Sequence, residues 1–97
     1  MIKLSLNLPV NDLAGKPIEG AATLSQLLSQ TIAAENLNPA IKWLDWAMTL
    51  FKTGEIQVDA SDFDLLYKQV EKFDKLTVLA KGQLLQALQR CKDQSAS

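Results

Sequence analysis

The sequence predicts an α+β fold that is mostly helical, with about four helices, a small N-terminal strand or hairpin and a possible short third strand. Two observations predict it. Apolar and polar residues alternate over residues 2–8, which is the period of a half-buried strand. Four later segments repeat apolar residues every three or four positions, which is the helical period. With 97 residues, of which 47% are hydrophobic, we expect a single globular domain over residues 1–92 and a frayed polar tail over 93–97.

Three short stretches have the composition of strands. The first covers residues 2–8 and ends at Pro9, because proline cannot donate to a sheet ladder. After a turn, residues 16–19 could return as a second strand in a loose hairpin. Residues 55–58 alternate again and could form a third strand beside the N-terminal one, which would join the middle of the chain to its start.

The first and third helices are predicted from their apolar faces and caps. Residues 21–35 form the first helix, and Asp59 or Ser61 caps the third. The buried face of the first helix is Leu24, Leu27, Leu28, Thr31 and Ile32, opposite Ser25, Gln26, Ser29 and Gln30. The buried face of the third is Phe63, Leu66, Tyr67, Val70 and Phe73.

The fourth helix is predicted over residues 76–92. Its buried face is Ala80, Leu84, Ala87, Leu88 and Cys91.

The second helix, from Pro39 to about Thr53, is the most informative segment. Asn38 should cap its start and Gly54 should follow its end. Its polar residues form one narrow stripe, which leaves an apolar arc of roughly 220° where a surface helix has about 100°. One flank of the arc is Trp43, Trp46 and Leu50, and the other is Ile41, Leu44 and Met48.

Two interpretations of this arc are open. Both flanks could be core, or the tryptophan flank could bind a partner, since tryptophan is enriched at binding hot spots. We therefore assign Trp43, Trp46 and Leu50 as candidate partner-binding residues.

The residue types argue against enzymatic activity. The chain has no histidine, so Cys91 has no imidazole to activate it, and no motif predicts a catalytic, cofactor or metal site. One acidic run is typical of a helix start, where carboxylates complement the helix dipole. It consists of Glu55, Asp59, Asp62 and Asp64. We expect neither an enzyme nor a small-molecule substrate.

Charge and hydropathy argue against nucleic-acid and membrane partners. The net charge is −1, which gives no general attraction to a polyanion. Gln83, Gln86, Gln89 and Arg90 match a DNA-reading face only weakly. No apolar run approaches the ~20 residues that span a bilayer, and residues 1–10 lack the continuous apolar region and cleavage site that we expect of a signal peptide. With a single cysteine, these features predict a cytoplasmic protein.

Three segments follow one another along the chain: residues 12–24, AIKWLDWAMTLFKTGEIQVDASDFDLL and LTVLAKGQLLQAL. Their order resembles that of a group of small phage and prophage accessory proteins. The resemblance covers most of the chain through packing patterns and brings no catalytic residues. It implies a protein from a tail-gene neighbourhood, similar to a tail assembly chaperone, in the host cytoplasm or the virion.

The hypothesis that follows is a non-enzymatic protein–protein interaction module of phage type, acting in assembly through a protein partner or self-association. One alternative is a phage-encoded inhibitor of a host defence or regulatory protein. A small DNA-binding regulator is the other, and the near-neutral charge disfavours it.

Overall fold

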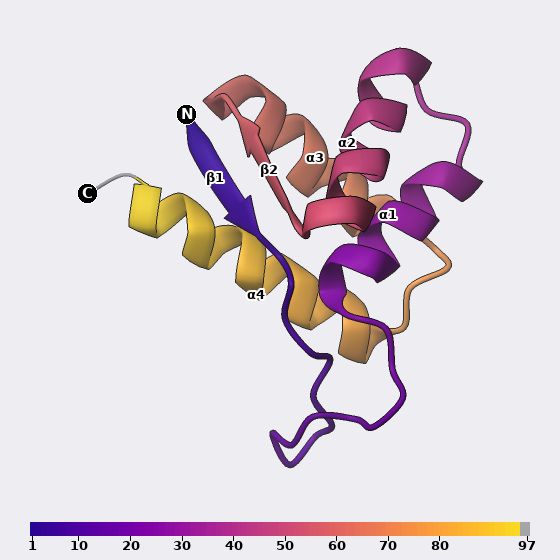
Figure 1. The fold of residues 1–97 in the computed structure, drawn as a ribbon, viewed down its shortest axis with the longest axis vertical. Helices are drawn as coiled ribbons and strands as arrows, with labels where there is room; N and C mark the ends of the chain where they lie inside the picture. Colours follow the sequence, from indigo (N-terminus) through magenta and orange to yellow (C-terminus); the bar gives the residue numbers. More distant parts are fainter. Residues whose placement is uncertain (96–97) are drawn as a thin grey trace.

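The computed structural model describes residues 1–95 and consists of two strands and four helices (Figure 1). In chain order these are β1 (Ile2–Ser5), α1 (Leu24–Ala34), α2 (Ala40–Thr53), β2 (Glu55–Val58), α3 (Ala60–Lys72) and α4 (Val78–Ser95). The predicted class, α+β and mostly α, is confirmed. Within residues 1–95, no helix combines the length and apolar character needed to cross a membrane.

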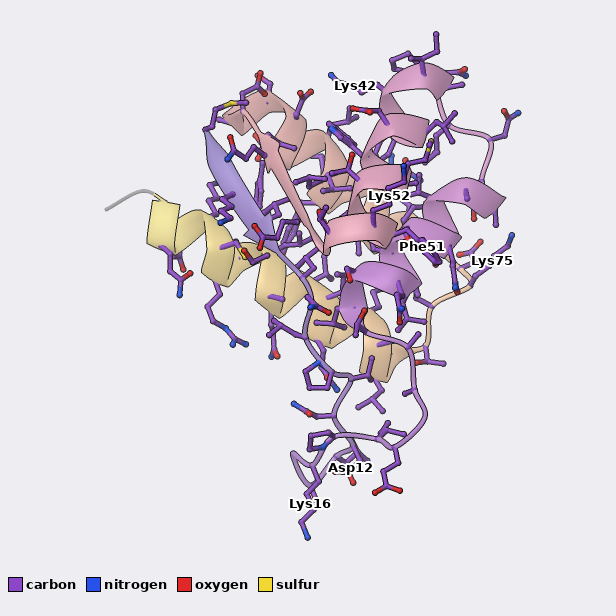
Figure 2. The ribbon with its side chains drawn as sticks, viewed as in Figure 1. Asp12, Lys16, Lys42, Phe51, Lys52 and Lys75 are labelled. Atoms are coloured by element: carbon purple, nitrogen blue, oxygen red, sulfur yellow. The ribbon has the colours of Figure 1, made fainter. Side chains whose placement is uncertain are left out.

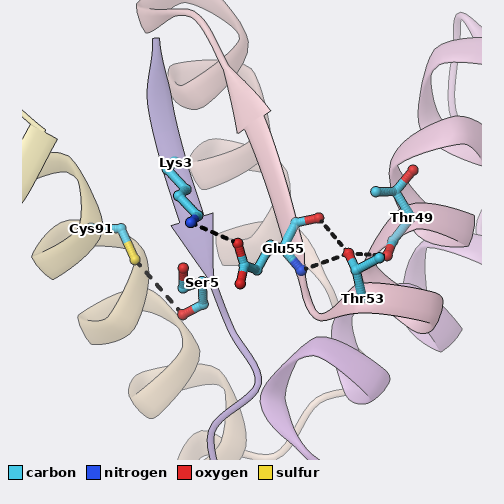
Figure 3. Close-up of polar contacts among 6 residues, drawn as sticks. All are labelled: Lys3, Ser5, Thr49, Thr53, Glu55 and Cys91. Atoms are coloured by element: carbon cyan, nitrogen blue, oxygen red, sulfur yellow. Dashed lines mark hydrogen bonds and ion pairs between the residues drawn. The ribbon is translucent and has the colours of Figure 1, made fainter.

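β1 and β2 form a two-stranded antiparallel sheet that joins the start of the chain to its middle (Figure 1). Leu4 pairs with Ile56 on the buried face of the sheet. On the exposed face the Lys3 ammonium lies 3.0 Å from a carboxylate oxygen of Glu55 (Figure 3). The prediction that residues 55–58 pair with the N-terminal strand is therefore confirmed.

The N-terminal strand is shorter than predicted, ending at Ser5 rather than at residue 8. At Leu6 and Leu8, the backbone carbonyls bond to a helix instead of a strand. The carbonyl of Leu6 accepts from the Ser25 N–H, and that of Leu8 accepts from the Leu24 N–H. These bonds satisfy donors in the first turn of α1 that have no partner within the helix.

The predicted second strand over residues 16–19 does not form. Only an isolated bridge joins Asn11 to Pro17. Proline has no N–H, so a regular ladder cannot extend through it. The segment instead makes a loop that projects from the body of the molecule (Figure 1).

Two helices have a different residue at the N-cap position than predicted, or begin later than predicted. Thr23 forms a capping box with Gln26, so α1 begins at Leu24 rather than at residue 21. Pro39 occupies the cap position of α2, one residue after the predicted Asn38, and has no side-chain cap bond.

Two other predicted helix boundaries are confirmed. Gly54 follows α2 with φ 78°, and the Asp59 carboxylate caps α3 by accepting from the Asp62 N–H.

α4 begins at Val78 rather than at residue 76, where the Thr77 hydroxyl accepts from the Ala80 N–H, and it ends beyond the predicted residue 92. Residues 93–95 continue the helix, and residues 96–97 of the predicted frayed polar tail lie outside the described part of the chain.

A continuous apolar core is formed by the buried faces of the six elements. The predicted faces of α3 and α4 are buried, with Tyr67 partly so. Ser25 and Ser29 were expected on the polar face of α1 but are buried. Their hydroxyls are satisfied locally: Ser29 donates to the Gln26 carbonyl, and Ser25 shares a hydrogen bond with Thr23.

Candidate protein-binding surface

Trp43, Trp46 and Leu50 lie in the core. None of the three is more than 7% exposed. The two indole rings meet edge to face, with centroids 4.9 Å apart and planes at 82°. The Trp43 indole N–H donates to the backbone carbonyl of Asn38, 3.3 Å away. The expectation that this flank is exposed to a partner is therefore wrong, and its role here is packing.

Polar contacts at the edge of the tryptophan flank hold it inward. Lys42 forms an ion pair with Asp62 of α3, and its ammonium lies 5.5 Å from the centre of the Trp46 ring. α2 can bury only one side of its wide apolar arc. Because tryptophan removes more apolar surface from water than isoleucine or leucine, burying this side is the more favourable orientation.

The other flank of α2 is exposed, and it extends one turn further than the sequence analysis assigned. The exposed fractions are 84% for Ile41, 56% for Leu44, 48% for Met48 and 59% for Phe51. Their spacing of three, four and three residues places the four side chains in one row along the helix. We call this row the α2 ridge.

α1 borders the ridge and adds no charge to it. No residue from Leu24 to Ala34 is ionisable. The buried Ser29 and Ala47 are small, and both line the space where α1 faces α2. Two hollows of about 290 Å³ each lie between the helices, and Ala33 and Leu44 line both of them. We call the α2 ridge together with these hollows the α1–α2 face.

The ends of the α1–α2 face carry opposite charges. Glu35 lines the hollow near the end of α1, and Lys52 lines the other, beside Phe51. Figure 2 shows Phe51 and Lys52 together where α2 borders α1, far from the projecting loop of Asp12 and Lys16. Within residues 1–95, neither Glu35 nor Lys52 forms an ion pair.

Two more charges lie nearby but line neither hollow. Lys75 donates to the Ala34 carbonyl at the end of α1, and Asp45 is exposed on α2.

The residues of the acidic run make separate structural contacts rather than one site. Asp59 caps α3, Asp62 pairs with Lys42, and Glu55 pairs with Lys3. Within residues 1–95, no group of three or more His, Cys, Asp or Glu side chains is placed to hold a metal ion.

Two further candidates from the sequence have structural partners. Cys91 is buried, with its sulfur 3.9 Å from the Ser5 carbonyl oxygen (Figure 3). The side-chain amide of Gln83 forms two hydrogen bonds with the projecting loop. It accepts from the Asn11 N–H at 2.8 Å and donates to the Asn11 carbonyl at 2.7 Å. It is therefore engaged within the fold rather than presented with Gln86, Gln89 and Arg90.

The side of α2 that the sequence pattern assigned to a partner is buried, and the opposite apolar side is exposed. Both flanks are apolar, so their pattern does not say which one is buried. Two features of the sequence are consistent with the ridge, its regular spacing through Phe51 and the lack of charge over residues 24–34, but neither shows that this side is exposed.

No family model matches the chain, and neither curated proteins nor solved structures give a match.

Proposed function

We propose that this protein is a non-enzymatic protein–protein interaction module that binds through the α1–α2 face. One observation carries the proposal: four large apolar side chains lie in a single exposed row beside a charge-free helix. A contiguous exposed apolar patch of this kind is typical of an interaction site, whereas scattered apolar residues need no explanation. The sequence resemblance extends the proposal to a phage-type accessory role in assembly.

The binding mechanism follows from the shape of the face. A row at three- and four-residue spacing packs against another helix as ridges fit into grooves. The hollows beside the row accept apolar side chains from the partner. Burial of the row then supplies the free energy of association, because that burial removes apolar surface from water.

A matched pair of leucine substitutions tests this proposal. Leu44→Glu places a carboxylate in the centre of the ridge, and Leu13→Glu makes the same change on the projecting loop, where Leu13 is almost fully exposed. Proteins captured by the tagged chain from its source cell are purified, and their affinities for each variant are measured. We expect Leu44→Glu to weaken binding at least tenfold and Leu13→Glu to leave it unchanged. Equal affinities for both variants would contradict the proposal.

A further inference from the structure

We infer that the partner on the α1–α2 face is a second copy of this chain, related by a twofold axis near Leu44. The inference rests on the proposed function, because it names the occupant of the same face. Three observations support it, concerning shape, charge and area.

The shape of the face suits a twofold contact. In such a contact the same patch of both subunits must fit itself, so it needs both a projecting part and a recess. The α1–α2 face has a ridge, from Ile41 to Phe51, and a hollow on each side of Leu44. The ridge of one copy therefore has a recess to enter in the other.

The charges favour an antiparallel arrangement. A twofold axis near Leu44 brings the Glu35 end of one copy onto the Lys52 end of the other. Glu35 then meets Lys52 at both rims, and the ridge between the rims carries only apolar side chains. Complementary rim charges of this kind fix the register of an interface.

The area is sufficient for a weak dimer. From their exposed fractions, the four ridge side chains present on the order of 500 Å² of surface. Two copies together would bury roughly 1,000 Å², which is the lower limit for a specific interface. We therefore expect a dimer that dissociates on dilution.

Light scattering or sedimentation over a wide concentration range tests the inference on the purified chain. The mass should rise from one chain to two with increasing concentration. Leu44→Glu should remain a single chain at every concentration, whereas Leu13→Glu should behave as the unmodified protein does. Circular dichroism confirms that each variant is folded. A single-chain mass throughout, or a dimer that Leu44→Glu leaves intact, would overturn the inference.

A charge exchange tests the twofold arrangement. Glu35→Lys and Lys52→Glu should each shift the dimer midpoint to higher concentration by several-fold, because each places like charges together at both rims. Combining the two substitutions should restore the original midpoint. If the double variant dimerises no better than the single ones, the antiparallel pairing is wrong.

Failure of this inference is distinguishable from failure of the proposed function. A chain that stays monomeric yet binds another protein through Leu44 overturns the second copy as occupant and supports the proposed function. A chain that neither self-associates nor binds any protein through Leu44 overturns both.

Discussion

Leu50 and Leu44 lie on different sides of α2. Leu50 is fully buried beneath the helix, and Leu44 is more than half exposed on the ridge. At the level of single residues, the sequence correctly identified both as apolar members of one helix. It did not determine which side faces inward, since that depends on how α1 and α3 pack against α2 and on the Lys42–Asp62 ion pair.

The same substitution at these two leucines should have very different effects on stability. Leu50→Ala should cost about 2–5 kcal/mol of unfolding free energy, because it leaves a cavity in the core. Leu44→Ala should change it by at most about 0.5 kcal/mol. Both changes have the same effect on helix propensity, so each is the control for the other. Urea denaturation under monomeric conditions measures the difference, and equal costs would show that the orientation of α2 is wrong.

At the level of elements, the junction between α2 and β2 depends on a close backbone approach. Gly54 has φ 78°, and a Cβ atom there would lie 2.7 Å from the Cβ of Asn7. Gly15 has a similar φ of 85° but no atom within 4 Å of such a Cβ. Sequence patterns correctly placed Gly54 after the helix. The contact with Asn7 was not predictable, because it arises from the pairing of two distant segments.

Replacing each of these glycines with alanine separates the cost of a left-handed backbone from the cost of a steric clash. Gly15→Ala should cost about 1–2 kcal/mol from the left-handed backbone alone. Gly54→Ala should cost about 1–3 kcal/mol more, because Asn7 and the backbone around it must move. Thermal unfolding measures both. Similar melting temperatures for the two variants would argue against the close packing at Asn7.

The projecting loop is tied to α4 by one side chain. Gln83→Leu keeps much of the size of the side chain but removes both hydrogen bonds to Asn11. We expect faster amide exchange at Asn11 and a stability loss of roughly 1–3 kcal/mol. Gln86→Leu, at an exposed position on the same helix, is the control. Unchanged exchange at Asn11 in the Gln83 variant would show that the loop is held by other contacts.

At the level of the whole molecule, the pairing of β1 with β2 closes a loop of chain that contains α1 and α2. The two strands are adjacent in the sheet although α1 and α2 separate them in the chain. Alternating patterns predicted this pairing, because both strands need a partner and both have one apolar face. The packing of the helices around the sheet was not predictable, since each helix has an apolar side that could fit several neighbours. For the same reason, the exposed ridge became evident only from the assembled fold.

The edge-to-face contact of Trp43 and Trp46 has a practical consequence. These are the only two tryptophans in the chain, and both lie on the buried side of α2. Tryptophan fluorescence therefore reports on a single location, the buried side of α2. Two indoles this close and nearly perpendicular also form a coupled pair of chromophores, whose near-ultraviolet circular dichroism disappears when their geometry is lost. The protein thus contains its own optical probe of native packing, and Leu44 variants can be checked with it without any added label.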